Sequence, residues 1–265
     1  MSSRREFLAA LAAPAFAAKL PTRTRKVETV FKSPGPKPNG LQATAEGLWI
    51  LDQGDNHAYL VSYTDGKVLR NLNTDSKAGS GITFDGEAIW LASTYSREII
   101  RADAKTGKTL AKFDCPGAGP VNWPNPRKSP LAKEPPATPR VALAKPAAPA
   151  QRVATGAHGL EWRDGKLWIA VPPAATVYRA NPTDLKIEYQ FKTAGDRPHG
   201  LGWDGKWLWC ADSNANCFHK YDPANGQVQE LIQLTDNDPL PHGMTIWKGW
   251  MWYCDDVGVV CKLKL

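Results

Sequence analysis

Three histidines of the chain each stand directly before a glycine and recur at nearly equal intervals. His158 and His199 are 41 residues apart, and His242 follows after another 43 residues. A fold that gathers these positions would bring three imidazoles into one site. A neutral imidazole can act as a general base, and three imidazoles with an open position can hold a catalytic metal ion. The three histidines are therefore candidate metal ligands, and His199 and His242 are candidate catalytic bases.

The histidines belong to a five-fold repeat. Each repeat has a glycine followed nine residues later by a tryptophan, in the pairs Gly40/Trp49, Gly81/Trp90, Gly159/Trp168, Gly200/Trp209 and Gly243/Trp252. The glycines are spaced 41, 78, 41 and 43 residues apart, so one interval contains an insert of 37 residues. Within one period, alternating apolar residues and turn sequences such as DGK and PANG predict four short strands.

Four strands in about 41 residues are typical of a β-propeller blade. The sequence therefore predicts an all-β, five-bladed β-propeller that occupies residues 18–265 as one domain. The fifth repeat ends at Leu265 after three strands, and residues 26–33 (KVETVFKS) are expected to supply its fourth strand and close the ring. A Pro-, Ala- and Lys-rich insert at about 116–154 is expected to be a loop. It is either a lid over the channel mouth or a surface excursion without a role.

The first strand of each propeller blade lines the channel, so the residue before each glycine is expected at one mouth. These residues are Asn39, Ser80, His158, His199 and His242. The second strand returns to the same mouth and ends, twelve residues after the glycine, at Asp52, Ser93, Val171, Asp212 and Asp255. Asp212 and Asp255 are candidates to orient the catalytic histidines. Candidate ligand-binding residues are Asn39, Ser80, Asp52 and Arg197.

Structural roles are an alternative for every one of these residues. A histidine before a glycine can close a turn through its ring, and an aspartate at a strand end can cap a hairpin. The tryptophans are expected to pack between blades. One observation favours a functional site: the first two repeats keep the glycine and the tryptophan but carry Asn39 and Ser80 instead of histidine. The turn therefore does not require histidine.

The N-terminus reads as an export signal. Arg4 and Arg5 precede a short apolar run, and Ala15-Phe16-Ala17 matches an A-x-A cleavage site. The arginine pair is typical of a twin-arginine (Tat) signal, with a Sec signal as the alternative. Residues 1–17 are therefore expected to be a signal peptide, and the mature protein is expected to be periplasmic or secreted. The apolar run is too short for a membrane span, and no other hydrophobic span exists.

The net charge of +7 does not indicate a nucleic-acid partner. Residues 1–26 and 120–152 each carry six Lys or Arg and one Glu, so the rest of the chain has a net charge of −3. No basic stripe remains for nucleic acid. The expected partner is a small-molecule ligand, and the protein is expected to be a monomer.

The cysteines have no metal or redox spacing. Cys210 and Cys217 flank one hairpin, as do Cys254 and Cys261, and Cys115 stands at the edge of the insert. Cross-strand disulfides within the two hairpins are compatible with an oxidising compartment, although strand geometry often forbids them.

The segments AHGLEWRDGKLWIA, PHGLGWDGKWLWCADSNANC and PHGMTIWKGWMWYCDD resemble the repeat of the virginiamycin B (streptogramin) lyase family. More broadly, the chain resembles SMP-30/gluconolactonase-type and glutamine cyclotransferase-type propellers. In the lyase family a Pro-His-Gly histidine is the general base and glutamates hold magnesium, and His199 and His242 match that turn. The chain departs from that family in having five repeats rather than seven blades and aspartates in place of the glutamates.

Two functions follow as expectations. The first is a lyase-, cyclase- or lactonase-type enzyme in which His199 or His242 is the base, with one divalent ion (Zn, Mg or Ca) as a candidate electrophile. The second is a non-catalytic propeller that binds a ligand or a protein at the same residues.

Overall fold

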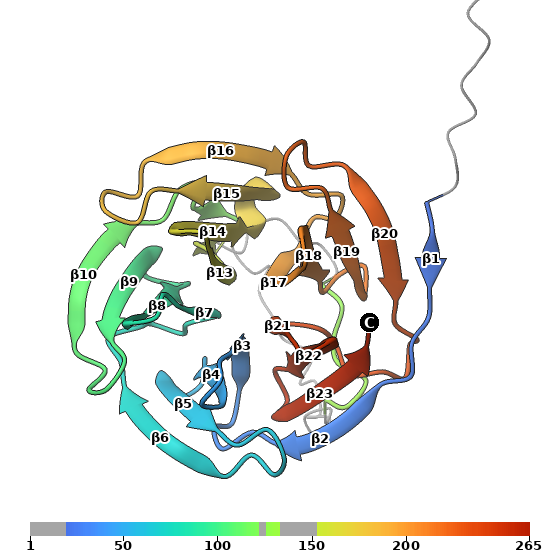
Figure 1. Ribbon diagram of the computed structural model, residues 1–265, viewed down its shortest axis with the longest axis horizontal. Helices are drawn as coiled ribbons and strands as arrows, with labels where there is room; N and C mark the ends of the chain where they lie inside the picture. Colours follow the sequence, from blue (N-terminus) through green and yellow to red (C-terminus); the bar gives the residue numbers. More distant parts are fainter. Residues whose placement is uncertain (1–19, 122–125, 133–152) are drawn as a thin grey trace, which may run out of the picture.

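The computed structural model describes residues 20–121, 126–132 and 153–265, and the expected signal peptide at residues 1–17 lies outside them. Regular structure in the described part is almost entirely β-strand, with one 3-10 turn at Pro172–Ala174. Apart from a two-stranded ribbon, the sheets form five blades around a central axis (Figure 1). The predicted all-β five-bladed propeller is confirmed.

Each blade is an antiparallel meander whose consecutive strands pair from the axis to the rim. The strands are β3 (Pro38–Ala43), β4 (Leu48–Asp52), β5 (His57–Val61) and β6 (Val68–Asn73) in blade 1; β7 (Gly81–Phe84), β8 (Ala88–Ser93), β9 (Glu98–Asp103) and β10 (Thr109–Asp114) in blade 2; β13 (Gly159–Arg163), β14 (Lys166–Val171), β15 (Thr176–Ala180) and β16 (Ile187–Lys192) in blade 3; β17 (Pro198–Asp204), β18 (Trp207–Asp212), β19 (Cys217–Tyr221) and β20 (Val228–Gln233) in blade 4; and β21 (Met244–Trp247), β22 (Trp250–Asp255) and β23 (Val259–Lys264) in blade 5.

The N-terminal stretch closes the ring, as the sequence predicts. Strand β2 (Glu28–Lys32) pairs antiparallel with β23 and completes blade 5. A second strand, β1 (Thr22–Arg23), pairs in parallel with β20 at the rim of blade 4 (Figure 1). Strand β1 was not expected from the sequence. The N-terminal stretch therefore joins two neighbouring blades.

The hydrophobic core is divided into layers between neighbouring blades. Each of the five layers contains one tryptophan of the repeat, and these side chains, Trp49, Trp90, Trp168, Trp209 and Trp252, are at most 5% exposed. Every blade thus contributes one large ring that fills the wedge-shaped space beside it. The prediction that the tryptophans pack between blades is confirmed.

The repeat glycines bring the blades into backbone contact at the axis. A Cβ on Gly40 would lie 2.9 Å from the backbone nitrogen of Ile82 in the next blade, and a Cβ on Gly200 would clash with the backbone nitrogen of Met244. The backbone of Gly200 also donates a hydrogen bond of 2.9 Å to the His242 carbonyl. The space lined by the five glycines has no volume for a water molecule. The glycine ring therefore separates the two ends of the channel.

The insert leaves blade 2 and returns to blade 3 through a short ribbon. Strands β11 (Gly119–Pro120) and β12 (Ala154–Thr155) pair antiparallel at its base. Residues 126–132 are the remaining described part of the insert.

All five cysteines are free thiols, so the disulfides considered from the sequence do not form. Strand register explains this in blade 5: Cys254 stands opposite Val260 whereas Cys261 stands opposite Tyr253, so the two thiols lie on opposite faces of the sheet. In blade 4, Cys210 stands opposite His219 and not opposite Cys217.

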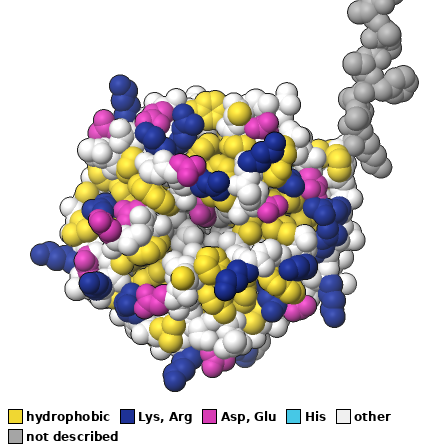
Figure 2. Space-filling view, in the orientation of Figure 1, with side chains coloured by type: hydrophobic (Ala, Val, Ile, Leu, Met, Phe, Trp, Pro, Cys, Tyr) yellow, Lys and Arg dark blue, Asp and Glu magenta, His cyan; other side chains and the backbone are white. Residues whose placement is uncertain are grey.

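The surface carries both signs of charge. Figure 2 shows Lys and Arg side chains interspersed with Asp and Glu over hydrophobic side chains on one face of the ring. Among residues 20–121, 126–132 and 153–265, we find no helix with the length and apolar character that a membrane span requires.

Candidate functional site

A pocket of about 260 Å³ opens at the end of the axis where the innermost strands begin. Asn39, His158, His199 and His242 line it, as expected for the residues that precede the repeat glycines. Ser80, the fifth member of that set, is fully buried beside the narrow axis, and its hydroxyl accepts a 3.0 Å hydrogen bond from Gln53. The repeat therefore brings the three histidines and Asn39 together.

Two of the histidines form a hydrogen-bonded chain. Nδ1 of His158 and Nε2 of His199 are 3.0 Å apart, and Nδ1 of His199 is 3.1 Å from the carbonyl oxygen of Arg197. A carbonyl only accepts, so Nδ1 of a neutral His199 carries the proton and its Nε2 accepts from His158. His158 then bears its own proton on Nδ1. The chain fixes the tautomers of both rings.

Both rings are neutral at pH 7. Burial, together with the charge of Arg197 and the ring of His242, lowers the pKa of His158 to about 3. Burial also holds the pKa of His199 well below its usual range, with His158 and Arg197 acting in the same direction. The His199 ring both accepts and donates in this hydrogen-bonded chain, so its position is fixed and it can hold a neighbouring side chain in place.

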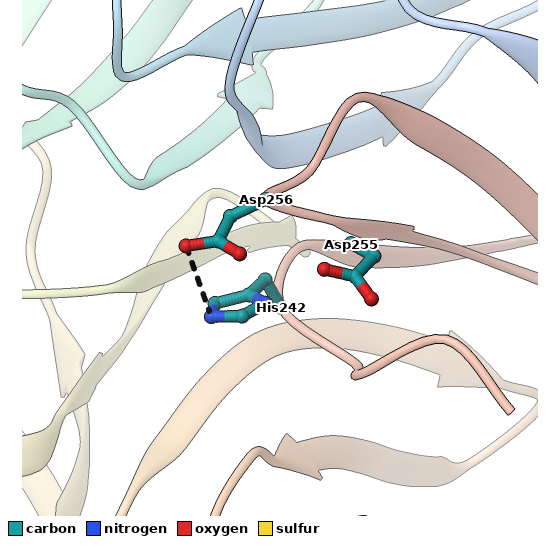
Figure 3. Close-up of side chains that lie close together, drawn as sticks. All are labelled: His242, Asp255 and Asp256. Atoms are coloured by element: carbon teal, nitrogen blue, oxygen red, sulfur yellow. Dashed lines mark ion pairs between the residues drawn. The ribbon is translucent and has the colours of Figure 1, made fainter. Parts of the chain in front are cut away.

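His242 is the histidine that faces a carboxylate. Its Nε2 lies 4.0 Å from an oxygen of Asp256, and its ring stands edge-on to His199 with 4.9 Å between ring centroids (Figure 3). Nδ1 of His242 is buried without a hydrogen bond of regular geometry to the described residues, and the ring interacts with the backbone of Leu240, which raises its pKa. Burial lowers the pKa of His242 to about 4, although the charge of Asp256 opposes this shift. His242 is therefore a neutral imidazole, and the negative charge of Asp256 lies close enough to stabilise its protonated form.

The aspartates at the ends of the second strands hold backbone. Asp52 accepts from the N–H groups of Lys37 and Gly54 at 2.7 and 2.8 Å, and Asp212 accepts from those of Arg197 and Ala215 at 3.1 and 2.8 Å.

Asp255 likewise accepts from the N–H of Leu240 at 2.6 Å. Among the described residues, neither Asp212 nor Asp255 bonds a histidine ring. The bonds to Gly54 and Ala215 cap the hairpins that follow, as the cap alternative supposed. The bonds to Lys37, Arg197 and Leu240 fix the segments that lead into the innermost strands.

Sequence analysis missed two charged residues of the pocket, Lys37 and Asp256. Lys37 and Arg197 share one repeat position, three residues before their glycines, so extending the alignment by two residues would have found Lys37. Asp256 follows the strand-end position by one residue. Nζ of Lys37 lies 3.8 Å from an oxygen of Asp256. Lys37 and Arg197 together exceed the charge of Asp256, so the pocket favours a group with negative charge.

One group of metal-ligating side chains lies close together in the described part of the chain. His242, Asp255 and Asp256 each offer a ligand atom within 4.8 Å of the others (Figure 3). This set shares only His242 with the three-histidine ligand set expected from the sequence. A ring nitrogen of His242 and the carboxylate oxygens of the two aspartates suit a divalent ion.

The insert forms part of the wall of the pocket. Val121, Val153 and Thr155 at its base line the pocket, and the Ser129 hydroxyl donates a 2.6 Å hydrogen bond to Asp255. Arg127 also forms a 2.6 Å ion pair with Asp236. Residues 126–132 of the insert therefore lie on the side of blades 4 and 5, next to the site.

Replacing Ser129 by alanine is expected to lower the free energy of unfolding by about 1.5–3 kcal/mol, because a buried carboxylate loses a hydrogen bond. Both residues are buried, at 8% and 0% exposure. Urea denaturation would measure the loss, with the exposed neighbour Lys128→Ala as the control. Equal stability of the two variants would show that Ser129 does not hold the insert.

Comparisons with known proteins support the fold. No family model and no curated protein sequence matches the chain. Glutaminyl cyclase from Myxococcus xanthus superposes with a TM-score of 0.65 at 10% identity, covering 93% of this chain and 98% of that chain. Selenomethionine-substituted virginiamycin B lyase from Staphylococcus aureus superposes with a TM-score of 0.51 at 16% identity, covering 91% and 99%. The chain thus has the β-propeller fold of both proteins, in agreement with the resemblance seen in its repeats.

Proposed function

We propose that the histidine pocket is the active site of an enzyme that uses a neutral imidazole to remove a proton from a small anionic molecule or from water. A lyase or a cyclase removes the proton from its substrate, and a lactonase removes it from water. The observation that carries this proposal is the buried His242 ring with Asp256 4.0 Å from its Nε2, in a pocket of about 260 Å³. An imidazole beside a carboxylate is a common general base.

The other residues of the pocket support this chemistry. Asp256 stabilises the imidazolium that forms when His242 takes a proton. Arg197 and Lys37 bind the negative group of the substrate and stabilise negative charge that develops in the transition state. The hydrogen-bonded pair His158 and His199 keeps the ring of His242 in place through their edge contact.

A divalent ion, Zn²⁺, Mg²⁺ or Ca²⁺, is the cofactor that we propose for the same site. His242, Asp255 and Asp256 would hold it, and it would supply a Lewis acid when bound. A His242 ring that holds the ion would be a ligand and not the base, so the ion and the imidazole base are alternative forms of the site. Metal content of protein purified without a histidine tag tests this proposal. About one ion per chain that disappears in His242→Ala would support it, and an equal content in both proteins would contradict it.

His242→Ala is expected to lower kcat/KM by about 100-fold or more, the usual contribution of a general base. The assay is a screen of lactones, of substrates with an eliminable group, and of substrates that cyclise, each with a carboxylate. His57→Ala is the matched control, since its ring bonds Asn71 in blade 1 outside the pocket. Both variants should keep the wild-type melting temperature.

The screen separates the two expected functions. Turnover that is lost in His242→Ala and kept in His57→Ala supports the enzyme. Ligand binding without turnover, weakened by His242→Ala, would replace the enzyme with a binding propeller. In the enzyme, kcat/KM should fall as the pH drops through about 4, because protonated His242 cannot accept a proton.

A further inference from the structure

A second polar ring lies around the axis on the other side of the glycines. It consists of the residues two positions after each repeat glycine, which are Gln42, Thr83, Glu161, Gly202 and Thr245. The four side chains of this ring are at most 9% exposed. Because the space at the glycine ring holds no water, this ring is separate from the histidine pocket.

Hydrogen bonds connect the members of this ring across the blades. The Thr83 hydroxyl donates to the side-chain oxygen of Gln42 at 2.6 Å, and the Thr245 hydroxyl accepts from the Ala43 backbone at 3.1 Å. The Gln42 side chain also favours the charged form of Glu161 and so lowers the pKa of that carboxyl group. Gln42 is in blade 1 and Glu161 in blade 3, which are not neighbours, so this interaction acts across the axis.

Glu161 is a member of this ring with an unused hydrogen-bond acceptor. It is 6% exposed, and its Oε2 is buried without a hydrogen bond to any described residue. Blade 4 contributes Gly202 at this level, and the side chains of Met244 and Ile246 pack against it, so that blade offers the carboxyl group no polar side chain. A buried carboxylate oxygen without a partner is costly unless it takes up a proton or a cation.

The geometry points to a cation site in which Glu161 is the charged ligand and the hydroxyl and amide oxygens around the axis are neutral ligands. Carboxylate, hydroxyl and amide oxygens select hard ions such as Ca²⁺, Mg²⁺, Na⁺ or K⁺. The cation competes with the proton of Glu161, since burial raises the pKa of this carboxyl group to about 8 while the charge of Arg163 lowers it. The groups that face Glu161 from the other blades, Gln42, Thr83 and Thr245, are uncharged.

Thermal unfolding of the full-length protein tests the site. Protein freed of metal is unfolded at pH 8.5 with added Ca²⁺, Mg²⁺, Na⁺ or K⁺ in separate arms. Because Ca²⁺ or Mg²⁺ in the histidine pocket would also raise the melting temperature, the comparison is made in Asp256→Asn, which alters the metal group of that pocket. In this variant at least one ion is expected to raise the melting temperature by several degrees, and to have no effect once Glu161→Gln, which keeps the shape of the side chain, is added.

Calorimetric titration of Asp256→Asn gives a second measurement. Cation affinity should rise about tenfold per pH unit between pH 6 and 8, because one proton must leave for each cation bound. An equal temperature shift in Asp256→Asn with and without Glu161→Gln would place the cation elsewhere. No response to any of the four ions would overturn the proposal.

Discussion

Gly200→Ala is expected to destabilise the propeller by about 3 kcal/mol or more, because the new methyl group would collide with backbone and not with a movable side chain. The Cβ would meet the backbone nitrogen of Met244 and the carbonyl carbon of Gly243 in the next blade. The hydrogen bond of 2.9 Å from Gly200 to the His242 carbonyl would break or stretch at the same time. Chemical denaturation would measure the loss.

Gly119→Ala is the matched control for this substitution. A Cβ on Gly119 has open space around it, so the change in unfolding free energy should stay within about 0.5 kcal/mol. If the two variants unfolded at the same denaturant concentration, backbone contact at the axis would not limit the packing of the blades. The Gly200 variant should also disturb the pocket, because the glycine directly follows His199.

A chain that begins at residue 34 is expected to lose more than about 4 kcal/mol of stability, because it lacks all of β2. Phe31 is the one residue of β2 that is buried, and it belongs to the core layer between blades 5 and 1. Without β2, strand β23 becomes the unpaired edge of a three-stranded blade. Melting temperature and solubility would report the effect.

The control is a chain that begins at residue 25, which lacks only β1. Strand β1 pairs through two residues, Thr22 and Arg23, so its loss should cost much less. This control keeps the hydrogen bond from Arg25 to the Lys264 carbonyl beside the closing strand. A wild-type melting temperature for the chain that begins at residue 34 would contradict ring closure by β2.

Sequence periodicity predicted the architecture because the glycine and the tryptophan of the repeat have the same structural role in every blade. The glycine is needed where backbones touch, and the tryptophan is needed where blades pack. The closing strand was predictable because one blade lacked a strand. Strand β1 was not predictable, because two residues added to a rim strand leave no periodic pattern.

The site was predictable at the level of the repeat positions. The residues before the glycines bring three histidines to one pocket, since all innermost strands begin at the same end. The choice of carboxylate was not predictable. Asp255 and Asp256 are adjacent in sequence, and only the course of the chain after β22 turns one toward backbone and the other toward His242. Spacing alone cannot distinguish two such neighbours.

The pairing of β2 with β23 also determines the order in which the protein can fold. Its partners, such as Glu28 and Lys262, are separated by nearly the whole chain, so this sheet cannot be completed before the last residues are available. Contacts this distant in sequence make folding slow, because the chain loses the entropy of bringing its two ends together before any contact between them stabilises it. Blades 1 to 3 consist of local hairpins and can form early. A chain in which β2 has not docked exposes the edge of β23 to other chains.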